Sequence, residues 1–95
     1  MTLTSPASTI TFYRRDDCAL CDEARTALQD VLEQRALRGD PGARVRVVNV
    51  ACDSELEAVY GARVPVLVVG EQELALTTSA RAIGAFLDRV LGRLA

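Results

Sequence analysis

Residues 8–24 read S-T-I-T-F-Y-R-R-D-D-C-A-L-C-D-E-A, which predicts a strand, a charged turn and the first turns of a helix. Isoleucine and phenylalanine alternate with threonine over residues 8–14, and such a segment of β-forming residues is typical of a strand. From Cys18 to about Leu37, apolar residues recur at spacings of three and four, which indicates an amphipathic helix. The apolar positions of this helix are Leu20, Ala24, Ala27, Leu28, Val31 and Leu32.

The middle of the chain predicts a second strand and a short helix. Residues 45–50 read V-R-V-V-N-V, a β-branched run that is typical of a strand buried on both faces in the middle of a sheet. Ser54, with Glu57 three residues later, fits a capping box that opens a short helix ending at Gly61. The first strand, the long helix and this second strand form a βαβ unit.

The last third of the chain predicts two more strands and a final helix. Residues 64–69 form an apolar strand, and residues 70–72 suit a tight turn into a brief strand over residues 73–76. The Thr-Thr-Ser cluster at residues 77–79 offers an N-cap to the final helix. The apolar stripe of that helix is Ile83, Phe86, Leu87, Val90, Leu91 and Leu94. The predicted order is β-α-β-α-β-β-α, an α/β fold with a mixed four-stranded sheet flanked by helices.

The composition fits a single domain over residues 1–95, with residues 1–7 as a loose leader. A net charge of -2 argues against a nucleic-acid partner. All 11 basic residues are arginine and histidine is absent, which excludes lysine Schiff bases, Ser–His–Asp and Cys–His catalysis, and imidazole zinc sites. The reactive side chains that remain are three cysteines.

The chain lacks the features of a membrane or secreted protein. No apolar run approaches the roughly 20 residues of a membrane helix, and the first residues lack the pattern of a secretory signal. We therefore expect a cytoplasmic monomer with no membrane partner. In a reducing compartment, a close cysteine pair is more often redox-active or metal-binding than a structural disulfide.

Cys18 and Cys21 have the spacing and the placement of a redox pair. Residues three apart on a helix share a face, so a small local adjustment brings two such cysteines to disulfide distance. The unpaired N–H groups and the dipole of a helix N-terminus favour the thiolate of Cys18. Cys18 would attack a substrate disulfide, and Cys21 would resolve the mixed disulfide. Arg14 and Arg15 add positive charge nearby, which the two following aspartates oppose.

Two further residues allow more than one interpretation. Pro65 begins an apolar strand, either because the backbone there must leave ladder groups free or because proline simply starts the strand. Cys52 ends the second strand, where a cysteine is more often a small buried hydrophobe than a regulatory thiol.

Taken together, the element order, the Cys-x-x-Cys pair and the Val-Pro step resemble glutaredoxins and the wider thioredoxin fold. The sequence is most similar to small glutaredoxin-like proteins with the pattern Cys-x-Leu-Cys-[Asp/Glu]-x-Ala followed by Val-Pro-Val-Leu. Residues 18–24 and 64–67 carry these motifs, and the resemblance covers roughly residues 9–91. It departs from glutaredoxins at Ala19-Leu20, where Pro-Tyr is usual, and at Arg63, where threonine is common.

The resemblance implies a thioredoxin/glutaredoxin-like fold and a thiol–disulfide oxidoreductase. Cys18 would be the attacking thiol and Cys21 the resolving thiol, with Pro65 in cis against the pair and the backbone of Val64 pairing with an extended substrate. The residues expected to bind substrate are Val64, Pro65, Arg14 and Arg15. The expected partners are disulfide-bearing proteins or glutathione as a co-substrate, with no bound cofactor and no metal.

Two hypotheses from other classes stay open at this point. The chain could be a non-catalytic binding module of thioredoxin fold, in which Cys18 would be unreactive. It could also be a thiolate metal carrier, in which Cys18 and Cys21 would hold a soft ion such as Cu(I) or zinc. Co-purified metal would indicate the carrier, and a reversible intramolecular disulfide would indicate the enzyme.

Overall fold

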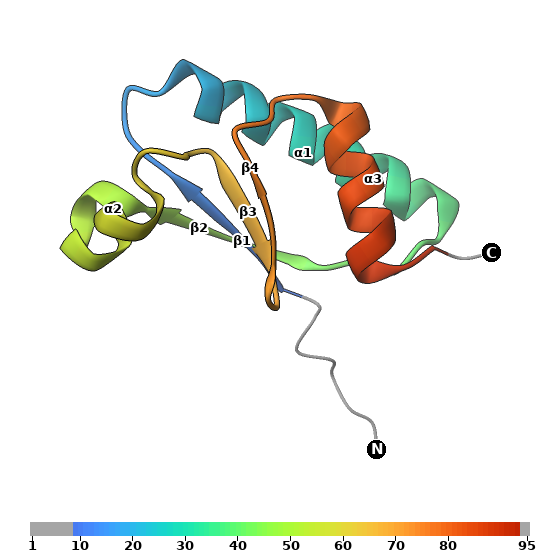
Figure 1. Ribbon diagram of the computed structural model, residues 1–95. Helices are drawn as coiled ribbons and strands as arrows, with labels where there is room; N and C mark the ends of the chain where they lie inside the picture. The colour runs from blue at the N-terminus through green and yellow to red at the C-terminus, as the bar shows by residue number, and fades with distance from the viewer. Residues whose placement is uncertain (1–8, 94–95) are drawn as a thin grey trace.

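The predicted order of elements is confirmed by the computed structural model, which describes residues 9–93 (Figure 1). The elements are β1 (Thr9–Arg14), α1 (Ala19–Arg38), β2 (Arg44–Asn49), a 3-10 turn η2 (Val50–Cys52), α2 (Ser54–Tyr60), β3 (Val66–Val69), β4 (Gln72–Ala75) and α3 (Ala80–Leu91). The predicted leader at residues 1–7 and the last apolar position of the final helix, Leu94, lie outside the described residues.

The four strands form one mixed sheet in the order β2-β1-β3-β4. β1 pairs with β2 in parallel and with β3 antiparallel, and β4 completes an antiparallel hairpin with β3. Phe12 at the centre of β1 lies opposite Val47 on one side and Leu67 on the other. β1 therefore crosses the middle of the sheet and carries the chain directly into the cysteine motif.

The prediction that residues 45–50 form a strand buried in the middle of the sheet is wrong. β2 is an edge strand, and Val45 and Val47 are 40% and 39% exposed. A run of β-branched residues indicates a preference for extended backbone, but it does not indicate whether the strand has neighbours on one side or on both. Because β3 occupies the other side of β1, β2 has a neighbour on one side only.

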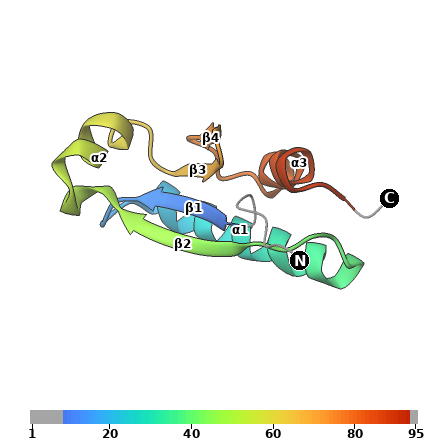
Figure 2. The ribbon, with the colours of Figure 1, turned by 90° about the horizontal axis from the view of Figure 1, so that it is seen from below.

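The main core lies between one face of the sheet and the two long helices. It is formed by the buried residues Ile10, Phe12, Ala24, Ala27, Leu28, Val31, Leu67, Val69, Ile83, Phe86 and Leu87, from β1, α1, β3 and α3. The shorter α2 lies beyond the ends of β1 and β2, whereas α3 lies toward the opposite end of the strands (Figure 2). The ends of the two parallel strands, the start of α1 and α2 thus meet at one end of the sheet.

The apolar stripe of α1 begins one residue later than the spacing predicts. Leu20 is 49% exposed, so its prediction as a core position is wrong, whereas Cys21 is fully buried. The buried face follows positions 21, 24, 28, 31 and 35, and it ends at a buried arginine rather than at an apolar residue. Leu20 is rotated by about 100° from Cys21 around the helix axis, which directs it toward solvent.

Helix caps decide where the two later helices begin. The carboxylate of Asp53 accepts hydrogen bonds from the N–H groups of Glu55 and Leu56 at 2.9 and 3.2 Å, so Asp53 is the N-cap of α2. The predicted cap, Ser54, is instead the first helical residue, because the Asp53 carboxylate one position earlier already accepts hydrogen bonds from these N–H groups. For α3 the predicted cluster does supply the cap, because Ser79 Oγ accepts from Ala82 N at 3.1 Å.

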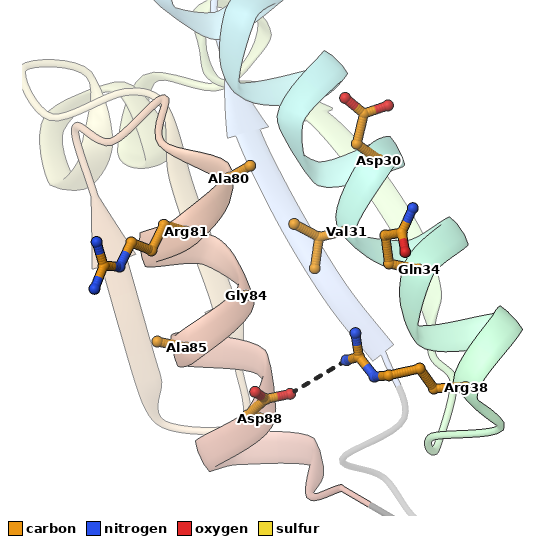
Figure 3. A pocket seen from close by; sticks show the side chains of 9 residues that line it. All are labelled: Asp30, Val31, Gln34, Arg38, Ala80, Arg81, Gly84, Ala85 and Asp88. Atoms are coloured by element: carbon orange, nitrogen blue, oxygen red, sulfur yellow. Dashed lines mark ion pairs between the residues drawn. The ribbon is translucent and has the colours of Figure 1, made fainter.

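Gly84 lies in the middle of α3 opposite Val31 (Figure 3), and we expect its replacement by alanine to stabilise the protein. A Cβ placed at position 84 meets only Val31 Cγ1, at 4.0 Å, which is an ordinary contact. Alanine in a helix interior is favoured over glycine by roughly 0.5–1 kcal/mol. Urea unfolding of Gly84→Ala should therefore show a raised free energy of unfolding. Gly70→Ala is the contrasting control, because φ is +60° there and the added side chain is strained.

Candidate active site around Cys18 and Cys21

Cys18 is the N-cap residue of the 20-residue helix α1. Its extended backbone (φ -119°, ψ 102°) turns the chain from the charged loop into the helix, and its sulfur accepts a hydrogen bond from Cys21 N at 3.1 Å. The sulfur therefore takes the place that a serine or aspartate oxygen usually occupies at a helix start. An N–H donor and the positive end of a long helix both stabilise negative charge at this position.

The two cysteines differ in exposure although they lie side by side. Their Cα atoms are 5.2 Å apart and their sulfurs are at disulfide distance. Cys21 is fully buried, whereas Cys18 is only partly buried. The geometry thus gives one thiol that an incoming molecule can reach and a second thiol that only the first can reach.

A second, smaller apolar cluster surrounds the pair. Its buried members are Cys21, Val50 and Val64, and the partly buried residues packed against it are Tyr13, Cys18, Leu56 and Tyr60. These residues come from the end of β1, from η2 and α2, and from the segment before β3. The cluster keeps water from Cys21 and places the Val-Pro segment beside the cysteine motif, although the two are far apart in sequence.

The peptide bond between Val64 and Pro65 is cis, as the resemblance to glutaredoxins implies. Pro65 is buried and directly precedes β3, and its carbonyl oxygen accepts a hydrogen bond from Leu76 N at 2.8 Å. Within residues 9–93, no hydrogen bond involves the backbone N–H or C=O of Val64. The unpaired backbone of Val64 fits the interpretation in which ladder groups stay free, and the place of Pro65 directly before β3 equally fits the interpretation in which proline begins the strand.

The two arginines predicted to bind substrate are held by acidic side chains. Arg14 donates to Asp16 at 3.4 Å and to Asp22 at 3.2 Å, which links the charged turn to the first turn of α1. Arg15 donates to Glu57 at 2.5 Å and to the carbonyl of Gly61 at 2.9 Å, which links the same turn to the end of α2. Their contacts brace the loop before Cys18, and their substrate-binding role stays a prediction.

An aromatic pair beside the site was not predicted from the sequence. The rings of Tyr13 and Tyr60 are stacked with centroids 4.1 Å apart, and the guanidinium of Arg63 lies 5.4 Å from the centroid of Tyr60. Burial, with a smaller contribution from Tyr13, raises the pKa of Tyr60 above its ordinary value of 10.0. Tyr13 lies on the face of β1 opposite Ile10 and Phe12, and this alternation was the available signal.

Cys52 is exposed, so its prediction as a small buried hydrophobe is wrong. It is the last residue of η2, a turn that leaves the sheet, and Val50 is the residue of that turn whose side chain is buried. Within residues 9–93, no group of three or more cysteine, aspartate or glutamate side chains is placed to hold a metal ion. In the same range no helix is long and apolar enough to cross a membrane.

A cysteine pair at the start of the first helix, a cis-proline before the third strand and a β2-β1-β3-β4 sheet together define a small thioredoxin-fold protein of the glutaredoxin-like kind. The chain belongs to the glutaredoxin-like domain family (DUF836), whose model matches residues 9–90. No protein of curated function matches the chain. Family and site geometry together support a redox-type role for Cys18 and Cys21.

Solved structures with the same fold include one related sequence and two distant ones. A structural-genomics target from X. campestris is 38% identical, with a TM-score of 0.69, and the match covers 84% of this chain and 96% of that one. A mutant thioredoxin from Halobacterium salinarum is 22% identical, with a TM-score of 0.64 and coverage of 87% and 74%. The glutaredoxin-like NrdH-redoxin from Escherichia coli is also 22% identical, with a TM-score of 0.57 and coverage of 81% and 92%. The last two likenesses show the fold alone.

Proposed function

We propose that this protein is a thiol–disulfide oxidoreductase that reduces protein disulfides or glutathione mixed disulfides through Cys18 and Cys21. One observation carries the proposal: the reachable sulfur of Cys18 caps α1 and accepts the N–H of Cys21, while the sulfur of Cys21 is buried at disulfide distance. A helix-capping sulfur is favoured as a thiolate, which is the form that attacks disulfides.

The reaction proceeds in two exchanges. The Cys18 thiolate attacks one sulfur of the substrate disulfide, the substrate S–S bond breaks, and the leaving thiolate takes up a proton. Cys21 then loses its proton and attacks the Cys18 sulfur, which releases the second substrate thiol. The substrate gains two electrons and two protons, and the protein is left with a Cys18–Cys21 disulfide that an external dithiol or glutathione must reduce.

The Val-Pro segment is the proposed binding edge. The unpaired N–H and C=O of Val64 would form two hydrogen bonds with an extended substrate, as at the edge of a sheet, and Pro65 would hold that backbone against the cysteines. Arg14 and Arg15 would contribute positive charge beside the entering disulfide. The NrdH-redoxin of the same fold is described as glutaredoxin-like with a thioredoxin-like activity profile, which supports a disulfide substrate. The protein would act in the cytoplasm as a monomer without a bound cofactor.

A redox titration tests this function directly. The protein is equilibrated in glutathione buffers of graded potential, quenched with an alkylating agent and weighed intact. We expect a reversible loss of two hydrogens that disappears in Cys18→Ser, and a stable mixed disulfide on Cys18 in Cys21→Ser. Thiols that stay reduced and alkylate slowly across the whole range would contradict the enzyme and favour a binding module.

A further inference from the structure

Leu76 combines two features that contribute nothing to the stability of the folded chain. Its backbone is left-handed, with φ at 58°, a conformation that a bulky L-residue rarely adopts. Its side chain is 58% exposed, so the apolar surface is not used in either core cluster of the described residues. A glycine at this position would remove both the strain and the exposed surface. Strained residues that a fold retains tend to lie at functional sites.

The position of Leu76 relates it directly to the cysteine site. Its N–H donates to the carbonyl of Pro65 at 2.8 Å, and Val64 on the other side of the cis bond belongs to the cluster that packs on Cys18. The segment that follows Leu76 runs past the first turns of α1 (Figure 1), where Thr78 lines a hollow with Asp22. Leu76 is thus hydrogen-bonded to the residue that follows Val64, and it lies two positions before Thr78, which approaches the first turns of α1.

A second exposed leucine occurs within the cysteine motif itself. Leu20, between the two cysteines, is 49% exposed. The cationic groups nearby are engaged with acids: Arg14 pairs with Asp22 at 3.2 Å and Arg63 with Glu73 at 2.9 Å. The exposed apolar surface of Leu20 and Leu76 is thus available to a molecule that approaches Cys18, beside arginines that already share their charge with acidic side chains.

We propose that Leu76 is a specificity-determining residue that, with Leu20, contacts apolar side chains next to the cysteine of a protein substrate. The inference rests on the proposed disulfide exchange and leaves its chemistry unchanged. It assigns the physiological substrate to disulfides in which at least one cysteine belongs to a protein. Glutathione disulfide is small and anionic, so it supplies no apolar side chain to bury against these leucines.

The test compares two disulfides on variants that keep the backbone of position 76. Asparagine and glycine both adopt the left-handed conformation readily, so Leu76→Asn and Leu76→Gly should both fold. Leu37→Ala, which removes an exposed leucine at the far end of α1, is the control. We expect kcat/KM for insulin reduction to fall about tenfold in both Leu76 variants, as for loss of one partly buried leucine contact. Reduction of glutathione disulfide should stay within about twofold, and Leu37→Ala should match the wild type on both substrates.

Three outcomes separate failure of this inference from failure of the proposed function. If the wild-type protein reduces neither disulfide, the proposed function is wrong and the inference falls with it. If the wild type reduces insulin and the Leu76 variants do so equally well, only the specificity role is overturned. A parallel loss on both substrates, with slower alkylation of Cys18, would also overturn it, because Leu76 would then act through the geometry of the cysteine pair.

Discussion

Replacement of Cys18 by serine is expected to abolish disulfide reduction, with a loss of at least about a thousandfold in rate. The serine hydroxyl is not a nucleophile toward sulfur and forms no mixed disulfide. Serine is nevertheless a preferred N-cap, so its Oγ should accept the N–H of Cys21 that the sulfur now accepts at 3.1 Å. The substitution therefore removes the chemistry while it keeps the start of α1, and insulin reduction together with far-ultraviolet circular dichroism measures both.

Cys52→Ser is the matched control for this experiment. It makes the same chemical change at an exposed cysteine on η2, outside the cluster around Cys21. We expect this variant to retain wild-type activity. If Cys18→Ser were active and Cys52→Ser inactive, Cys52 would be the nucleophile and the proposed mechanism would be wrong.

Local patterns in the sequence were sufficient to predict the order of elements and the cysteine site. The spacing of apolar residues, every second residue in a strand and every third or fourth in a helix, depends only on near neighbours. This explains why β1, α1 and α3 lie where they were expected. The change from the first spacing to the second, after residue 14, also places Cys18 at the start of α1. The cis bond at Pro65 came from family resemblance, because nothing local to a Val-Pro step fixes its isomer.

The features that were missed depend on contacts between distant segments. The edge position of β2 is decided by where β3 pairs, and the stacking of Tyr13 on Tyr60 joins residues 47 positions apart. The burial of Arg35 is of the same kind. Arg35 continues the buried face of α1. From sequence alone an arginine is expected to be exposed to solvent, because its buried partners are distant in the chain.

Arg35 links the end of α1 to the end of α3. The residue is 1% exposed, and its guanidinium donates to Asp88 at 2.7 Å and to the carbonyls of Pro41 and Gly92 at 2.8 and 2.7 Å. Arg38 approaches the same carboxylate at 3.9 Å (Figure 3). One buried cation therefore satisfies three acceptors from two segments of the chain, the loop after α1 and the end of α3, and Asp88 supplies its main countercharge.

Replacement of Asp88 by alanine is expected to lower the free energy of unfolding by about 2–4 kcal/mol. Loss of one member of a buried ion pair leaves the other charge uncompensated in a region of low polarity, which typically costs about 3–5 kcal/mol. The lower range is appropriate here because the Asp88 side chain is 31% exposed and Arg35 keeps its two carbonyl acceptors. Urea unfolding followed by circular dichroism measures the change, which is large for a chain of 95 residues.

Two comparisons show whether this loss arises from the charge of Arg35. Glu33→Ala removes an exposed carboxylate from α1 that has no ion pair within residues 9–93, and it should change the unfolding free energy by less than about 0.5 kcal/mol. The double variant Arg35→Met with Asp88→Leu removes both charges, so it should be more stable than Asp88→Ala alone. A double variant no more stable than the single one would show that Asp88 contributes by packing rather than by neutralising Arg35.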